Sequence, residues 1–306
     1  MKLVTEVTCT RSASPIRLDG DICLLGSCFA DEMGRKLSDA GFRVLANPFG
    51  TLYNPASLAA AVARLDEPVP FREEDCVPLG AGDGRIGSFS HHTSFARSTA
   101  AEFLDVANAA LAEAAGAWRR CGTVILTLGT ARVWRALELP GRPVVANCLK
   151  RPAREFAHEL LSTDECARLL RGIVEAHPDK HFILTVSPIR HLGDGAHANT
   201  VSKATLHLAI EQLCLPEAAG SRPAEVSRHP RPDRGSLVEY FPAYEILMDE
   251  LRDYRFYAED LVHPAPTAVQ LVWERFLEAY ADPADLPRIR ENEKAARAAR
   301  HCPKKI

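Results

Sequence analysis

Short, uninterrupted apolar runs alternate along this chain with stretches of helical periodicity. The runs cover residues 22–25, 123–128 and 182–186, and each is followed by a glycine or by a Ser-Pro pair. A strand that is apolar on both faces is typical of a sheet covered on both sides. The helical stretches between and after the runs occupy residues 31–40, 55–65, 100–119, 163–177, 203–213 and 267–281. This alternation predicts βαβ units, a mainly parallel sheet and an α/β fold class.

The size and composition of the chain fit one large globular domain. It has 306 residues, of which 46% are hydrophobic and 25% charged, and this usage excludes a disordered chain or a coiled coil. We expect a domain over residues 1–285, followed by a basic C-terminal helix or tail at 286–306. That last segment carries seven Lys or Arg against two Glu, a balance of +5. A solvated helix explains this balance, and contact with an acidic partner or RNA is the alternative.

The net charge and the cysteines indicate which binding partners and which cellular compartment to expect. The 37 Lys and Arg against 40 Asp and Glu leave a net charge of −3, without the basic excess of a nucleic-acid binder. No apolar run approaches the roughly 20 residues of a membrane helix, and the N-terminus lacks the apolar core of a signal peptide. The nine cysteines form no C-x-x-C pair, which argues against a disulfide framework or a cysteine zinc site. We expect a cytoplasmic protein without nucleic-acid or membrane partners; its oligomeric state stays open.

Two short segments at opposite ends of the chain carry residues that suit catalysis. Ser27 follows Gly26 where the first apolar run meets a helix, at the sheet edge where ligands of parallel sheets bind. A Gly-Ser pair there is also a common helix N-cap. Asp260 and His263 are three residues apart, so one turn can place the carboxylate against one ring nitrogen while the other nitrogen faces a nucleophile. A capped turn with a satisfied histidine is the alternative interpretation of this pair.

Six segments in this order resemble the GSCFA family, although each segment alone is unspecific. They are GSCFA at 26–30, TLGTA at 127–131, NCLK at 147–150, SPIRH at 187–191, YFPAYEI at 240–246 and DLVHP at 260–264. The family is similar to the SGNH/GDSL hydrolases, so the resemblance implies a flavodoxin-like, three-layer α/β/α sandwich. It also implies a triad in which Ser27 is the nucleophile, His263 the base and Asp260 the residue that orients the base. The substrate class does not follow from the resemblance.

The groups that would stabilise an oxyanion are less clear from the sequence. The wider superfamily places a Gly-x-Asn-Asp segment after a central strand, whereas residues 129–132 of this chain read Gly-Thr-Ala-Arg. We expect the side chain of Asn147 to replace the missing asparagine, and the N–H groups of Gly50 and Ser27 to complete the oxyanion hole.

Several further side chains could take part in the site. Cys28 is an alternative nucleophile, because thiolates are intrinsically stronger and helix N-termini lower the pKa of a thiol. We favour Ser27, since a side chain one position further into the helix is expected to point elsewhere. Arg190 could anchor an anion through its two-pronged guanidinium. No histidine pair has the spacing or the carboxylates of a metal site, so we expect no metal. The residues that could line the substrate pocket are His91, His92, Arg190 and His191.

These features together predict a serine-dependent acyl ester hydrolase that uses no cofactor. Its substrate would be a small-molecule or carbohydrate ester. Transfer of the acyl group to a sugar or metabolite hydroxyl is one alternative, because the triad does not distinguish transfer from hydrolysis. A catalytically silent module that binds a carbohydrate or acyl ligand is another.

Overall fold

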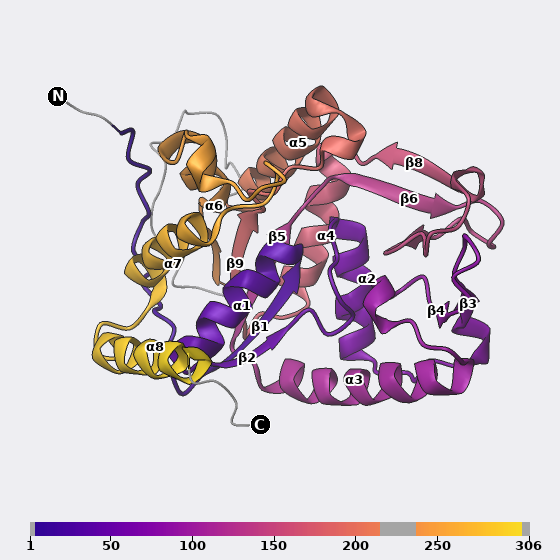
Figure 1. Cartoon of the computed structure of the whole chain (residues 1–306), viewed down its shortest axis with the longest axis horizontal. Coiled ribbons are helices and arrows are strands. Elements are labelled where there is room, and N and C mark those ends of the chain that lie inside the picture. The colour runs from indigo at the N-terminus through magenta and orange to yellow at the C-terminus, as the bar shows by residue number, and fades with distance from the viewer. Residues whose placement is uncertain (1–3, 215–236, 302–306) are drawn as a thin grey trace.

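A five-stranded parallel sheet organises the computed structural model, which describes residues 4–214 and 237–301 (Figure 1). The strand order is β10-β9-β5-β1-β2, and every neighbouring pair is parallel. The strands are β1 (Asp21–Gly26), β2 (Arg43–Ala46), β5 (Thr123–Leu128), β9 (His181–Val186) and β10 (Leu237–Tyr240). The three apolar runs of the sequence are the three central strands, so the prediction of a parallel sheet is confirmed.

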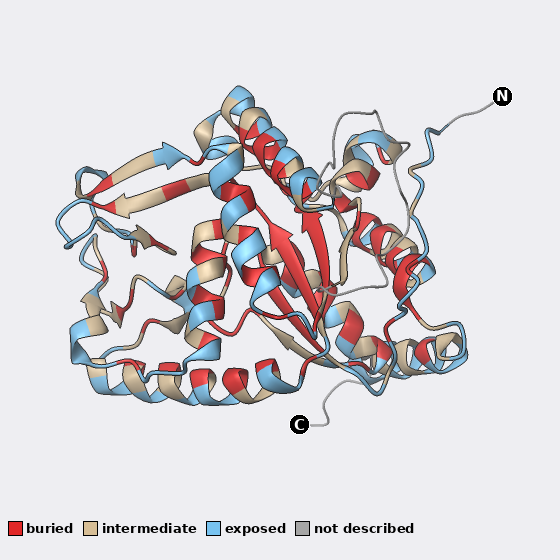
Figure 2. Cartoon of the chain, turned by 180° about the vertical axis from the view of Figure 1, so that it is seen from behind, coloured by how far each residue is buried: buried red, intermediate tan, exposed pale blue. Residues whose placement is uncertain are grey.

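The sheet separates two hydrophobic cores because successive side chains of a strand point to opposite faces. In β1, Cys23 and Leu25 pack into one core, while Ile22 and Leu24 pack into the other. Figure 2 shows the central strands as the most continuously buried part of the chain, between helices that are exposed on their outer sides. This two-sided burial explains why the central strands lack a polar pattern.

Helices cover both faces and complete a three-layer α/β/α sandwich, the predicted fold class. One face is covered by α2 (Pro55–Asp66), α3 (Ala100–Arg120), α4 (Thr163–Glu175) and α5 (Ala196–Cys214). The other is covered by α1 (Cys28–Ala40), α6 (Ala243–Glu245), α7 (Pro266–Tyr280) and α8 (Leu286–His301). Short turns are 3₁₀ at η1 (Glu73–Asp75), η2 (Thr93–Phe95), η3 (Ala153–Glu155), η4 (Leu192–Asp194) and η6 (Tyr254–Phe256), and π-helical at η5 (Ile246–Glu250).

A second, antiparallel sheet projects beside the main one and was not predicted (Figure 1). Its order is β7-β6-β8, with β6 (Arg132–Ala136), β7 (Val144–Val145) and β8 (Phe156–Leu160). A two-stranded hairpin, β3 (Val77–Pro78) with β4 (Ile86–Gly87), lies in the glycine-rich segment before α3. Strands β6 and β8 carry charged and polar residues, and β3, β4 and β7 have two residues each, so none of them has the apolar run that identifies a central strand.

The basic segment after residue 285 forms a docked helix over its described part. Ile289 of α8 is fully buried, and the side chain of Asn292 donates to the carbonyl of Ala40 at the end of α1 (2.9 Å). The indole of Trp273 in α7 donates to Glu293 at 2.6 Å. Helix α8 therefore belongs to the α1 and α7 layer, and residues 302–306 of the predicted tail lie outside the described residues.

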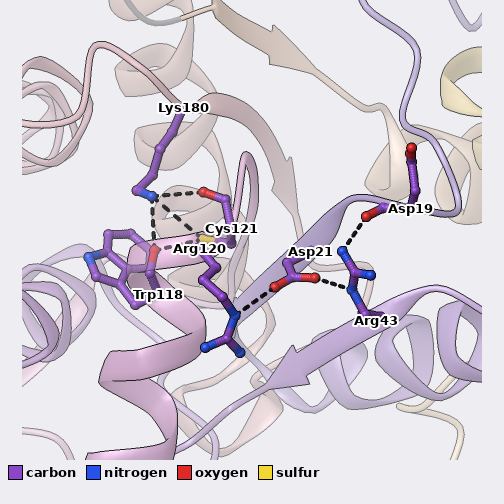
Figure 3. Close-up of polar contacts among 7 residues, drawn as sticks. All are labelled: Asp19, Asp21, Arg43, Trp118, Arg120, Cys121 and Lys180. Carbon is purple, nitrogen blue, oxygen red and sulfur yellow. Dashed lines mark hydrogen bonds and ion pairs between the residues drawn. The ribbon is translucent and has the colours of Figure 1, made fainter.

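Hydrogen bonds and ion pairs, drawn in Figure 3, occupy the polar side chains at the amino ends of the central strands. Asp21, the first residue of β1, accepts hydrogen bonds from Arg43 and from Arg120 (3.1 Å for the latter). Before β9, the buried ammonium of Lys180 donates to the carbonyl of Trp118 near the end of α3 (2.9 Å). A lysine there satisfies carbonyls that the end of the helix leaves unpaired. The opposite, carboxyl edge of the sheet is the one left for ligands.

Candidate functional site

The turn between β1 and α1 is tightly built at the carboxyl edge of the sheet. Gly26 has φ +150°, and a Cβ at this position would collide with the carbonyl of Thr127 on β5, so the close approach requires glycine. Ser27 is fully buried and is the N-cap of α1, with its Oγ accepting from the N–H of Phe29 at 3.3 Å. The N–H of Ser27 donates to the carbonyl of Thr127 at 3.1 Å. Helix α1 begins at the next residue, Cys28.

Cys28 is partly exposed at the first position of α1, and its sulfur lies 3.6 Å from Nε2 of His263. Burial is the largest influence on this thiol and raises its pKa. The backbone N–H groups of Cys28 and Phe29 at the start of α1 lower the pKa, and Asp31 raises it further. The sulfur therefore lies between an imidazole and the N-terminus of a helix.

Asp260 holds both the imidazole and the turn that carries it. Its Oδ2 lies 2.6 Å from Nδ1 of His263, and its Oδ1 accepts from the N–H groups of Val262 and His263, each at 2.9 Å. The backbone N–H groups of His263 and Val262 lower the pKa of Asp260 to about 2, and the imidazole adds to this effect. Leu261 within the turn has φ +57°, a conformation that a leucine rarely adopts. The turn and the contact with Asp260 leave Nε2 of the half-exposed imidazole on the side of Cys28.

A pocket of about 200 Å³ lies at the same edge, between the ends of β2, β5 and β9 and the small sheet. Tyr53 and His191 line it with their ring centroids 5.2 Å apart, whereas Cys28 and His263 are not among its lining residues. Trp134 of β6 also lines it and stacks on another lining residue, His158, with ring centroids 4.0 Å apart. The other lining residues are Asn54, Thr130, Arg132, Val145, Ala146, Gly193 and Asp194.

Comparison with known proteins places the chain in a family. Residues 21–276 match the sequence pattern of the GSCFA family. The chain belongs to the GSCFA family. No curated protein and no solved structure gives a significant match to the chain. The match begins at the first residue of β1 and ends in α7, so it includes both segments that form the Cys28–His263–Asp260 contact.

The GSCFA motif gives the imidazole a different neighbour from the one expected. Asp260 and His263 are brought together, but the atom facing His263 is the sulfur of Cys28, and no hydrogen bond joins His263 to Ser27 in the described part of the chain. The reason is local geometry. An N-cap side chain folds over the first turn to accept from an N–H group, whereas the next side chain projects away from the helix end. The assignment of Ser27 as the residue facing His263 is corrected to Cys28.

Ser27→Ala separates the capping role of this residue from a nucleophilic one. Loss of the N-cap should destabilise the protein by about 1 kcal/mol, which lowers the Tm by about 2 °C in a chain of this size. Thermal unfolding measures this shift, and alkylation of Cys28 by iodoacetamide should continue at close to the wild-type rate. A Ser27→Ala variant that keeps its Tm but loses all turnover of a model ester would return the nucleophilic role to Ser27.

Two of the three groups expected to form an oxyanion hole already have acceptors in this GSCFA chain. The N–H of Ser27 donates to Thr127, and that of Gly50 donates to the carbonyl of Asn47 at 2.8 Å. Asn147 lies in the loop after β7, where its Oδ1 accepts from the N–H of Leu149 at 2.7 Å, and it is not among the residues that line the pocket. The N–H groups of Ser27 and Gly50 are therefore not free to donate to an oxyanion, and the role of Asn147, whose Nδ2 is its donor, stays a prediction.

Sequence reasoning missed three residues beside the GSCFA motif. Asn47 accepts from the N–H of Gly26 (2.8 Å) and donates to Asp31 (2.7 Å), so it ties the β1–α1 turn to the end of β2. The carbonyl of Tyr53 accepts from the two N–H groups that follow β5. Asn54 uses its Oδ1 to cap α2, and its Nδ2 has no hydrogen bond within the described residues. The signal was present in the segment after β2, which is rich in residues typical of turns.

His91 and His92 do not line the pocket. His91 is buried among aromatic rings, 4.6 Å from that of Phe71, and burial lowers its pKa to about 4. Its Nδ1 pairs with Ser88 at 2.7 Å, which makes it a core residue. His92 caps the short turn η2 through the N–H of Ser94. Neither histidine is therefore among the residues that line this pocket, and a contact of either with the substrate stays a prediction.

Arg190 and His191 lie where they were expected, directly after β9. His191 lines the pocket, and burial lowers its pKa to about 4, with the charges of Lys203 and His263 acting in the same direction. The buried Nε of Arg190 has no hydrogen-bond partner among the described residues. The sequence did not identify Lys203, which is buried in α5 and donates to the carbonyl of Ser187 at 2.7 Å.

Two further properties concern metals and membranes. Within residues 4–214 and 237–301, no group of three or more His, Cys, Asp or Glu side chains could hold a metal ion. No helix in that part of the chain is both long and apolar enough to span a bilayer.

Proposed function

We propose that this GSCFA protein is an acyl hydrolase that acts on ester bonds through a Cys28–His263–Asp260 triad. The proposal rests on two contacts of the His263 imidazole, one made by each ring nitrogen. Nε2 of His263 lies 3.6 Å from the sulfur of Cys28, and Nδ1 lies 2.6 Å from Asp260. A nucleophile, a base within reach of it and a group that orients the base are the elements of covalent acyl transfer.

The reaction would proceed in two steps with His263 carrying one proton. In the first, the sulfur of Cys28 attacks the ester carbonyl while its proton passes to Nε2 of His263. The tetrahedral intermediate expels the alcohol, which takes that proton, and a thioester on Cys28 remains. In the second, His263 removes a proton from water, the hydroxide attacks the thioester, and the acid leaves as the thiol is restored.

Two groups support stabilisation of the oxyanion. The N–H of Cys28 lies at the first position of α1, where helix geometry supplies no intrahelical acceptor. The Nδ2 group of Asn54 belongs to a residue lining the pocket. Each such donor is worth about 3 kcal/mol of barrier in acyl-transfer enzymes.

The pocket favours a small substrate. Its volume of about 200 Å³ suits a short acyl group or one sugar ring, and the stacked Trp134 supplies an aromatic wall for a carbohydrate ester. We also propose that the chain resembles the SGNH/GDSL hydrolases, and this resemblance favours ester chemistry. Acyl transfer to a second hydroxyl would use the same thioester, so hydrolysis and transfer are separated by adding an acceptor alcohol to the assay.

Probes that distinguish thiols from hydroxyls test the proposal directly. Iodoacetamide should label Cys28 and stop turnover of p-nitrophenyl acetate, whereas a fluorophosphonate should leave Ser27 unmodified. Cys166 is fully buried and serves as the internal control that should remain unlabelled. Peptide mass spectrometry measures both sites. Fluorophosphonate labelling of Ser27 with loss of turnover would overturn the cysteine mechanism in favour of the serine mechanism.

The labelling rate of Cys28 should rise steeply with pH. Burial raises the pKa of this thiol, so the neutral form predominates at pH 7 and the reactive thiolate is a minor species. Below the pKa, each pH unit increases the thiolate population about tenfold, and the rate should follow it between about pH 6 and 8. Iodoacetamide kinetics followed by mass spectrometry give the profile. A rate that is flat over this range would mean that a thiolate is already formed at pH 6.

A further inference from the structure

Two cationic side chains lie near the end of β9, Arg190 in the segment that follows this strand and Lys203 through its hydrogen bond to Ser187. Lys203 projects from α5 with only 1% of its surface exposed. Burial lowers the pKa of Lys203 to about 7; the positive charge of Arg190 lowers it further, and a negative charge on Cys28 would raise it. Lys203 is therefore within electrostatic range of both Arg190 and the candidate nucleophile.

Neither cation has a counter-ion in the part of the chain that the structure describes. No carboxylate lies within 4 Å of Arg190 or Lys203 there, and the buried Nε of Arg190 makes no hydrogen bond. Lys203 donates to the carbonyl of Ser187 at 2.7 Å and lies 6.0 Å from the ring of Tyr244. Two like charges of which one is fully buried are unfavourable, as the lowered pKa of Lys203 reflects, and a bound anion would compensate them.

The surroundings of the pair connect it to the loop that carries the imidazole. The charge of Arg190 acts on Tyr244 and on Tyr257. Tyr257 pairs with Pro264, the residue after His263, in an isolated β-bridge. On the other side, Lys203 acts on His191, which lines the pocket. Arg190 is thus the sequence neighbour of a residue that lines the pocket.

We propose that Arg190 and Lys203 form a subsite for an anionic group, a carboxylate or a phosphate, on the substrate that Cys28 attacks. The inference rests on the proposed acyl transfer and names its substrate class. Arg190 is only partly buried and can donate two parallel hydrogen bonds to such a group. Lys203 is held by Ser187 and supplies a second positive charge from behind. Binding the anion would compensate the charges that the fold leaves unpaired.

Two alkylating reagents of nearly equal shape but different charge test the subsite without requiring turnover. The sulfur of Cys28 displaces iodide from neutral iodoacetamide or from anionic iodoacetate. We expect the ratio of the iodoacetate rate to the iodoacetamide rate to be about tenfold higher at Cys28 than for glutathione, as one favourable charge contact of ~1.4 kcal/mol gives.

Arg190→Gln should return that ratio to the glutathione value, and Arg190→Lys should retain most of the preference. Arg17→Gln is the matched control, because Arg17 is an exposed residue before β1 that pairs with Asp282. It should leave the ratio unchanged. A ratio that is the same in wild type, Arg190→Gln and Arg17→Gln overturns the subsite.

Competing anions identify the group that the subsite prefers. Acetate or inorganic phosphate, added separately, should protect Cys28 from iodoacetamide in the wild type but not in Arg190→Gln. The anion that protects more strongly shows whether the subsite prefers a carboxylate or a phosphate. Failure of the subsite leaves Cys28-dependent ester turnover intact, with no anion preference. Turnover that survives Cys28→Ala overturns the catalytic proposal while the anion protection can persist. A Cys28 that reacts with neither reagent overturns both.

Discussion

Cys28→Ala should lower kcat/KM for p-nitrophenyl acetate by at least about 1000-fold, because no other group then forms the covalent intermediate. The thiol is the side chain that His263 contacts, at 3.6 Å. Alanine removes the sulfur and keeps a good helix former at the start of α1, so the variant should fold. Steady-state kinetics together with thermal unfolding separate loss of chemistry from loss of structure.

Cys148→Ala is the matched control for this variant. Cys148 is also partly exposed, and burial raises its pKa to about 11, but it lies in the loop after β7. Its replacement should leave kcat/KM within about twofold of wild type. Turnover that persists in Cys28→Ala but disappears in Ser27→Ala would refute the cysteine assignment and support the one made from the sequence.

Asp260→Asn should reduce kcat/KM by about 10⁴-fold, the loss that an amide at this position of a triad causes. The asparagine Oδ1 can still accept from the N–H groups of Val262 and His263, so the turn should remain. Its Nδ2 group replaces the Oδ2 that faces Nδ1 of His263, and two donors then face each other. The ring must adopt the other tautomer, which places a proton on Nε2 and leaves no acceptor for the thiol proton.

The ionisation of Asp260 determines what the pH dependence of the wild-type rate can report. Hydrogen bonds from His263 and Val262 keep the pKa of Asp260 at about 2, so its carboxylate is ionised at every pH from 5 to 9. Its own titration therefore contributes nothing to the wild-type profile in this range. Asp253→Asn is the control, because Asp253 caps a similar turn through the N–H of Arg255. Equal kcat/KM in the Asp260→Asn and Asp253→Asn variants would remove Asp260 from the reaction.

The sequence was sufficient to predict the layers of this fold. The three apolar runs are uninterrupted because β1, β5 and β9 are buried on both faces, and burial on both faces is what such a run encodes. The strands β6 and β8 carry Arg, Trp, His and Glu among other apolar residues, so no single period identifies them. Their pairing depends on tertiary contacts that a local pattern does not contain.

The sequence predicted where the candidate site lies better than it predicted the role of each residue in it. Asp260 and His263 could be paired from their spacing, since one turn determines their contact. The choice between Ser27 and Cys28 depended on the direction of adjacent side chains at a helix start, and capping reverses the expectation made from order alone. The oxyanion donors were not predictable, because the partner of an N–H group such as that of Gly50 is set by the folded turn.

The contact between Cys28 and His263 joins residues 235 positions apart. During synthesis, β1 and α1 leave the ribosome long before β9, β10 and the His263 loop exist, so the thiol emerges without its base. Parallel strands that pair across long sequence separations also fold slowly. A nascent or nicked chain that lacks the segment after β10 would thus carry an unassisted cysteine, and reactivity at Cys28 would report completion of the fold.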